Sequence, residues 1–189
     1  MFNRHHRRLR RRPILTLTGK RKSFVFHTDI DTMTRWYVEP ANPIDAVEIA
    51  SLYSRVWVAY RGALANVLLD HRMPDAGKIE RLMDDIPYFV IRSEGRIIAV
   101  ARAKIEFEAC YLERMVVDGE YRRKGVGTVL VEQIVEHARK NGAHKVFLNT
   151  SPKLIESIEF YQRMGFVQAG YFKKHFWGED VVFFEMLLD

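Results

Sequence analysis

Apolar and polar residues alternate in two different rhythms along this chain, and each rhythm predicts a different kind of element. Residues 125–140 place an apolar side chain at every third or fourth position, so that Val126, Leu130, Ile134 and Ala138 share one helical face. Charged side chains fall on the opposite face. This spacing predicts an amphipathic helix with one buried side.

The period-two rhythm of strands occurs before and after this helix. Short runs rich in β-branched and aromatic residues are separated by turn residues, as is typical of strands. Ser93-Glu94-Gly95 marks the turn of a hairpin within residues 88–107. The other expected strands occupy residues 35–42, 110–117 and 144–150, and a closing hairpin occupies 166–175 and 180–188.

Further helices are predicted around these strands. Residues 44–70 have helical periodicity, and we expect two helices that break near Ser54. Residues 77–86 form a short helix that ends before Pro87, and residues 152–164 form the last helix. Strands and helices in this order predict an α/β or α+β fold, with a mixed sheet and helices on both faces.

Composition limits the chain to one hydrophobic core. It has 189 residues, of which 48% are hydrophobic and 29% charged, which suits one globular domain better than two. No apolar run approaches the roughly 18 residues needed to cross a bilayer, so we expect no membrane association. The single cysteine, Cys110, excludes an internal disulfide and suits a reducing compartment, and we expect a cytoplasmic protein.

The net charge of +6 is concentrated at the N-terminus. Residues 1–32 contain nine Lys or Arg and two acids, whereas residues 33–189 contain 21 basic and 22 acidic side chains. We expect 1–32 to be a disordered or non-native extension that precedes a single domain at 33–189. Two alternatives stay open: an organelle transit peptide, and a basic arm at residues 4–22 that binds nucleic acid.

The most informative short stretch is "EYRRKGVGTVL", residues 120–130. Three basic residues, Arg122 to Lys124, lead directly into Gly125 and Gly127 at the start of the predicted helix. A helix N-terminus presents unpaired N–H groups, and glycines let the backbone curve closely around an anion. The spacing matches neither the Walker loop nor the Rossmann fingerprint. It therefore predicts a site for a phosphate-like group of another kind.

Two further motifs place this loop in a family context. Arg122-x-x-Gly125-x-Gly127 has the form [QR]-x-x-G-x-[GA], and "FYQRMGF" at residues 160–166 has the form F-Y-x-x-x-G-F. With "RWYVEPANPIDAVEIASL" at the start, the chain resembles the GNAT superfamily of acetyl-CoA-dependent N-acyltransferases over residues 34–188. The resemblance implies the GNAT-like acyl-CoA N-acyltransferase fold, with a central, mostly antiparallel sheet.

The resemblance also implies acetyl-CoA as co-substrate. Backbone N–H groups of the loop would bind its pyrophosphate, and two strands, 111–117 and 144–149, would splay apart to admit the pantetheine arm. Leu154 stands where the family often has Asn. The scattered histidines show no metal-ligand spacing, and no metal is expected. The implied cofactor-binding residues are Met115, Val116, Val117, Arg122, Arg123, Lys124, Gly125, Val126, Gly127, Thr128, Asn149, Ser157 and Tyr161.

Acetyl transfer to an amine needs a base, because a lysine-like amine is neutral in only about one molecule in 2,500 at pH 7. Glu113 is the candidate base. Tyr111, Glu113, Met115 and Val117 are expected to alternate onto one strand face, which in the resembling fold includes the catalytic centre. The alternative is that Glu113 pairs with a neighbouring cation.

The remaining catalytic roles come from the resemblance. Tyr161 matches the family tyrosine that protonates the coenzyme A thiolate, and a backbone N–H near Val116 and Val117 would stabilise the oxyanion. An acyl-enzyme on Cys110 is a minor alternative, because nothing nearby in the sequence activates that thiol.

The expected function is therefore an N-acetyltransferase that moves acetyl from acetyl-CoA to a primary amine, on a small molecule or a protein, by direct attack in a ternary complex. The alternatives are a non-catalytic acyl-CoA sensor, or an acetyltransferase of a nucleic-acid-associated protein; a homodimer is also open. We expect acidic residues near the acceptor site to favour a cationic amine. The candidate acceptor-site residues are Trp57, Tyr60, Arg61, His175, Trp177, Glu179 and Asp180, with added acidity from Asp84, Asp85, Glu106 and Glu108.

Overall fold

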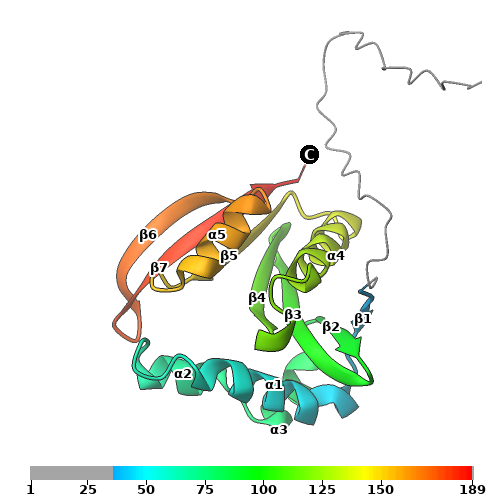
Figure 1. Cartoon of the computed structure of the whole chain (residues 1–189). Coiled ribbons are helices and arrows are strands. Elements are labelled where there is room, and N and C mark those ends of the chain that lie inside the picture. The colour runs from blue at the N-terminus through cyan, green and yellow to red at the C-terminus, as the bar shows by residue number, and fades with distance from the viewer. Residues whose placement is uncertain (1–35, 189) are drawn as a thin grey trace, which may run out of the picture. The chain divides into compact units, whose positions relative to one another are not determined.

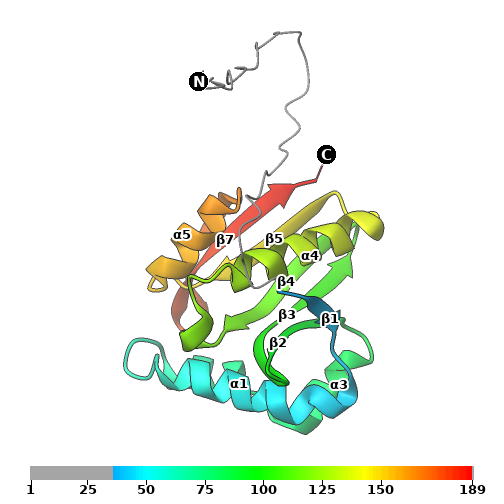
Figure 2. The same cartoon turned by 45° about the vertical axis from the view of Figure 1, so that its right-hand side comes forward.

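The computed structural model describes residues 36–188, which are built around one seven-stranded sheet (Figure 1 and Figure 2). Neighbouring strands are antiparallel except for β4 and β5, which are parallel. The mostly antiparallel mixed sheet is therefore confirmed. In spatial order the strands are β1 (Val38–Pro40), β2 (Tyr88–Ser93), β3 (Arg96–Glu106), β4 (Ala109–Val117), β5 (Lys145–Thr150), β7 (Glu179–Leu187) and β6 (Val167–Phe176).

Helices cover both faces of the sheet, as predicted (Figure 2). On one face Ile49 and Leu52 pack with Val90 and Val100 of the strands, and on the other Leu130 belongs to the core that includes Ile98 and Leu148. The first face carries α1 (Ala46–Val58), α2 (Asn66–Arg72) and α3 (Ala76–Met83), and the second carries α4 (Val126–Lys140) and α5 (Ile155–Arg163); short 3₁₀ turns occupy Pro43–Asp45 and Gly119–Tyr121.

The predicted break near Ser54 is wrong, because α1 continues from Ala46 to Val58. Ser54 lies on the exposed side of the helix, so its hydroxyl does not interrupt the backbone hydrogen bonds. The helix ends at Val58, and a further turn follows at Gly62, whose φ of +86° suits glycine far better than other residues.

The parallel pair β4 and β5 separates after a short contact. Ala109–Tyr111 pair with Lys145–Phe147, whereas β7 pairs with the other edge of β5 along all of Lys145–Thr150. Within the described residues, β4 from Leu112 onward has no strand partner on its β5 side. The splay expected from the resemblance is therefore present.

A β-bulge changes which side chains of β4 share a face. Glu113 pairs with Arg102 and Val116 pairs with Val100, so two residues of β4 lie opposite the single residue between Arg102 and Val100. Arg114, one of the two, has a φ of +53°. The bulge puts Val116 on the α1 side with Glu113, and Met115 packs on the α4 side. The expectation that Glu113 and Met115 share one face is wrong for this reason.

Membrane-spanning helices are absent from residues 36–188, where every helix is too short or too polar to cross a bilayer. The predicted extension at residues 1–32 lies outside the described part of the chain.

Candidate active site

The candidate site lies where β4 and β5 separate. A cavity of about 70 Å³ opens there, and its lining includes Glu113, Met115, Asn149, Ser157 and Tyr161. All five were predicted from the sequence as catalytic or cofactor-binding residues, so the fold brings them together. Because β4 bulges at Arg114, side chains from both of its faces reach the same opening.

The glycine loop ends directly at the N-terminus of α4. Gly125 is the N-cap, with a φ of +79°, and no side chain among the described residues caps this helix. The first N–H groups of α4 therefore remain available to an anion. Trp36 anchors the loop, because its indole Nε1–H donates to the carbonyl oxygen of Lys124 at 2.9 Å.

Gly127 permits a close approach of α4 to its neighbours. A Cβ at this position would lie 3.2 Å from Cε of Met115 and 3.3 Å from Cζ of Phe160, which is tighter than ordinary van der Waals contact. The glycine thus lets the helix start beside β4 and α5 together. Its role is packing, whereas that of Gly125 is backbone conformation.

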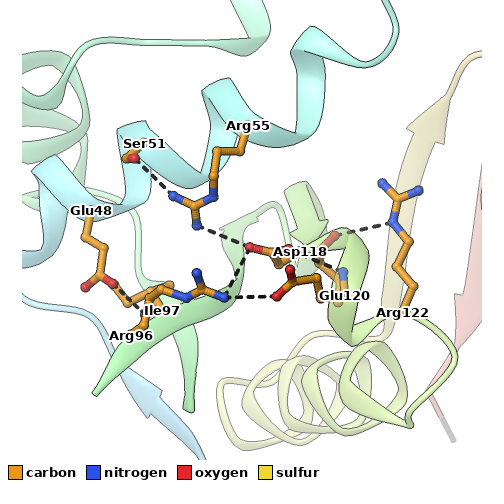
Figure 3. A network of polar contacts seen from close by, with 9 residues as sticks. Glu48, Ser51, Arg55, Arg96, Ile97, Asp118, Glu120 and Arg122 are labelled. Atoms are coloured by element: carbon orange, nitrogen blue, oxygen red, sulfur yellow. Dashed lines mark hydrogen bonds and ion pairs between the residues drawn. The ribbon is translucent and has the colours of Figure 1, made fainter. Parts of the chain in front are cut away.

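Polar contacts hold the turn that precedes the loop (Figure 3). The Asp118 carboxylate pairs with Arg55 of α1 at 3.3 Å and with Arg96 of β3 at 4.0 Å. Arg122 donates from Nε to the carbonyl oxygen of Val117 at 3.4 Å. These contacts fasten the end of β4 to both α1 and β3, and so fix where the loop begins.

Tyr161 projects from α5 to the α4 side of β4. Its hydroxyl lies 3.8 Å from Sδ of Met115, a weak acceptor, and its ring packs edge-on against Phe160 and Phe166. Burial raises the pKa of Tyr161 to about 12, partly offset by the positive charge of Arg72. The phenol is therefore protonated at neutral pH, and its hydroxyl donates to a weak hydrogen-bond acceptor.

Glu113 forms an ion pair with Arg102, with 2.9 Å between Oε2 and Nε. Both side chains are largely buried, at 17% and 11% exposed. Burial opposes the charge of Arg102, but Glu113 and the hydroxyl of Tyr88 outweigh it, so the pKa of Arg102 is raised. Glu113 thus pairs with a cation, as the alternative interpretation expected, and it also lines the cavity.

A polar pair sits at the point where the strands part. Asn149 donates from Nδ2 to the hydroxyl of Tyr111, and the Tyr111 ring stacks on Phe147 with centroids 4.7 Å apart. Burial is the main cause that raises the pKa of Tyr111. Leu154, which replaces the family's usual Asn, lines the cavity with an apolar side chain.

Two arginines in the cavity were not predicted. Arg72 ends α2 and Arg114 is the bulge residue, and both line the opening beside Glu113. No local sequence signal marks either one, because Arg72 has the usual helix-end preference of a cation and the bulge has no glycine. The packing of α2 reveals Arg72, and the register of β4 against β3 reveals Arg114.

A smaller hollow adjoins the cavity on the side of the last hairpin. Trp57, Glu179 and Asp180 line it, as expected of acceptor-site residues, together with Arg72. Trp177 instead packs against His71, with ring centroids 4.5 Å apart. The other candidates line neither opening: Tyr60, Arg61, His175, Asp84, Asp85, Glu106 and Glu108. Asp84, Asp85, Glu106 and Glu108 therefore do not add the expected acidity to either opening.

Cys110 is fully buried, and burial raises the pKa of its thiol to about 12. A thiol in that state is a poor nucleophile. Within residues 36–188 no cluster of three or more His, Cys, Asp or Glu side chains is arranged to hold a metal ion.

Comparison with known proteins adds an independent line of evidence. The sequence profile described as "Acetyltransferase (GNAT) family" matches residues 49–166. Glucosamine 6-phosphate N-acetyltransferase 1 of Oryza sativa is 41% identical over 81 residues, which cover 39% of this chain and 47% of that protein. The probable N-acetyltransferase camello of Xenopus tropicalis is 26% identical over 78% of this chain and 68% of its own length. The chain thus spans about half to two thirds of these two relatives.

Solved structures share the fold. PaiA N-acetyltransferase from Thermoplasma acidophilum, in complex with coenzyme A, matches with a TM-score of 0.71 at 16% identity, over 82% of this chain and all of that one. The acetyltransferase YncA from Salmonella typhimurium, with acetyl-CoA, matches with a TM-score of 0.67 at 19% identity, over 82% of this chain and 94% of that one.

Proposed function

Because this chain belongs to the acetyltransferase (GNAT) family of acyltransferases, we propose that it transfers acetyl from acetyl-CoA to a primary amine by direct attack within a ternary complex. The observation that carries the proposal is the uncapped start of α4 beside the gap between β4 and β5. A diphosphate and an extended amide chain require these two features side by side.

The loop fits the diphosphate of the co-substrate. Arg122 to Thr128 supply backbone N–H groups at a helix N-terminus, and the left-handed backbone at Gly125 turns the loop without a Cβ in the way. Met115 to Val117, unpaired on the β5 side in the described chain, offer backbone groups to the amides of the pantetheine arm. Asn149 and Ser157 line the same gap and complete the proposed cofactor site.

Tyr161 is the proposed general acid. Acetyl-CoA supplies an activated thioester, and its departing sulfur needs a proton. The Tyr161 hydroxyl keeps its proton at neutral pH, and among residues 36–188 it is engaged only by the weak acceptor Met115. We assign the oxyanion contact to a backbone N–H of Val116 or Val117, beside the bulge.

Glu113 is the proposed base. It is the carboxylate that lines the larger cavity, where Tyr161 also lies. Its ion pair with Arg102 engages Oε2 and holds the side chain in a fixed position. The other oxygen can take the amine proton, directly or through one water.

Direct attack is favoured over an acyl-enzyme by the state of Cys110, whose buried thiol is not activated. The sensor alternative is disfavoured because the family is one of acyltransferases and Tyr161 and Glu113 both line the cavity.

The test is a pair of measurements on the full chain. Calorimetry with coenzyme A should show binding at one site, and thiol release from acetyl-CoA should rise when an amine from a varied panel is added. Absence of coenzyme A binding would overturn the proposal, and binding without release on any amine or peptide would leave the sensor reading in its place.

A further inference from the structure

Positive charge exceeds negative charge around the larger cavity. Arg72, Arg114 and Glu113 line it, and Arg102 lies behind Glu113. Glu113 forms an ion pair with Arg102, so Arg72 and Arg114 leave a net positive charge at the cavity. This is the opposite of a site built for a polycation.

Arg72 has no carboxylate partner within residues 36–188. Its guanidinium lies over the ring of Trp57, with Cζ 5.6 Å from the ring centroid, and it forms neither an ion pair nor a side-chain hydrogen bond there. Burial lowers the pKa of Arg72, and the charge of Glu113 offsets this only in part. Arg72 also lines both openings, so it stands at their junction.

Arg114 is held in place but is not neutralised. It donates from Nη1 to the carbonyl oxygen of His71 at 2.7 Å, and its Nη2 lies 2.9 Å from Nδ1 of the same residue. Burial, and after it the neighbouring positive charges of Arg72 and Arg102, lower the pKa of Arg114 to about 10. Two arginines that repel one another in a buried site gain stability from an anion between them.

The carboxylates of the smaller hollow do not supply that anion. Glu179 accepts from the backbone N–H of Ala65 at 3.0 Å and pairs with Lys153 at 2.9 Å. Asp180 accepts from the Tyr171 hydroxyl and from the backbone N–H of Lys174. Glu179 thus joins the last hairpin to its surroundings, and Asp180 is engaged within that hairpin.

We propose that Arg72 and Arg114 bind an anionic group, a carboxylate or a phosphate, carried by the acceptor close to the amine that is acetylated. The inference rests on the proposed function and names the substrate class of the same site: a small amino acid or an amino sugar phosphate rather than a polyamine. Arginine suits both anions because its planar fork pairs with two oxygens at once. Glu113 and Tyr161 line the same cavity, so the anion and the reacting amine lie on one small molecule.

Matched acceptors test this inference. Thiol release is measured with L-aspartate and its diamide, and with glucosamine 6-phosphate and glucosamine, so that each pair shares an amine and differs in charge. The wild-type chain should use one anionic member at least about 10-fold better than its neutral partner in kcat/KM, as expected for a charge-assisted contact. The pair that shows the preference identifies carboxylate or phosphate as the source.

Variants assign the preference to these residues. Arg72→Gln should reduce the preference for the anionic acceptor about 10-fold or more, while the KM for acetyl-CoA stays within about twofold of the wild-type value. The preference of Arg72→Lys should lie between those of the wild type and Arg72→Gln. Arg139→Gln removes the same charge from the exposed face of α4, where Arg139 pairs with Glu136, and should leave the preference intact. If Arg72→Gln instead raises the KM for acetyl-CoA and leaves the preference for the anionic acceptor unchanged, Arg72 belongs to the cofactor site and the inference is overturned.

Direct binding separates this inference from the proposed function. Calorimetry with the same four compounds is run on the chain saturated with coenzyme A. Anion-dependent binding that Arg72→Gln abolishes, without turnover of these compounds or of any amine or peptide in the wider panel, would support the anion site and overturn the transferase. Equal turnover of neutral and anionic partners would support the transferase and overturn the anion site.

Discussion

Tyr161 shows at the scale of one residue how burial prepares a proton donor. Its ring packs edge-on against Phe160 and Phe166, and its hydroxyl donates to the thioether of Met115 at 3.8 Å. The pKa, raised to about 12 from 10.0, keeps the proton on the phenol throughout the neutral and mildly alkaline range. Met115 is in place because the bulge turned it to the α4 side.

Tyr161→Phe removes this proton donor and little else. We expect kcat to fall by about 100-fold or more, with coenzyme A affinity within about threefold of the wild type, because an acid acts only in the transition state. Since deprotonation would begin only as pH approaches about 12, Tyr161 should cause no alkaline loss of activity below pH 10. Steady-state kinetics and calorimetry check both parts, and an unchanged kcat would exclude the assignment.

Glu113→Gln tests the proposed base. The amide keeps the size of the side chain but cannot accept the amine proton, so kcat should fall by about 100-fold or more. Glu185→Gln is the matched control, because Glu185 pairs with Lys145 at 3.0 Å and lines neither opening. If both variants lose only stability, measured by thermal unfolding, and not kcat, Glu113 is a structural ion-pair partner of Arg102.

The glycine loop and α4 act together at the scale of elements. Gly125 begins the helix and Gly142 follows its end, and both have left-handed φ values, +79° and +74°. A Cβ at either position meets nothing within 4 Å. The two glycines therefore carry the same backbone strain on substitution but differ in their distance from the proposed diphosphate.

Gly125→Ala and Gly142→Ala separate strain from binding. Each should lower the free energy of unfolding by about 1 kcal/mol, because an alanine disfavours this backbone region. Only Gly125→Ala should also weaken coenzyme A binding, by about 10-fold, as the loop loses its curvature. Chemical denaturation and calorimetry give the two numbers, and equal affinity losses in both variants would contradict a binding role for the loop.

The element order was predictable because its signals are local. The apolar period of α4 and the turn residues of the β2–β3 hairpin lie within single segments. The break predicted near Ser54 was wrong, because a serine is compatible with a helix when its side chain faces water. The bulge at Arg114 was invisible for another reason: it depends on how β4 registers with β3, and its left-handed residue is not glycine.

At the scale of the molecule, the site is assembled from segments far apart in the chain. Ala65 near α2 meets Glu179 of β7, and Arg114 of β4 meets His71 of α2. The described residues 36–188 contain the sheet, the loop and both openings.

Because residues 36–188 line both openings, removal of residues 1–32 should leave kcat unchanged. Because this segment carries a net charge of +7 and the remainder −1, the truncation should abolish any salt-sensitive binding to duplex DNA. Binding titrations at two salt concentrations measure this. If the full chain and the truncated chain bind DNA alike, the nucleic-acid alternative for this segment is wrong.

The sequence by itself determined the order of elements, the position of the glycine loop and the two motifs that pointed to the family, because each is written within a short stretch of chain. Only the tertiary structure decided that β4 bulges at Arg114, that Glu113 pairs with Arg102, and that Arg72 reaches the cavity. These features depend on strand register and on the packing of α2 against the sheet. Such long-range contacts are chosen by the whole core, so no local pattern encodes them.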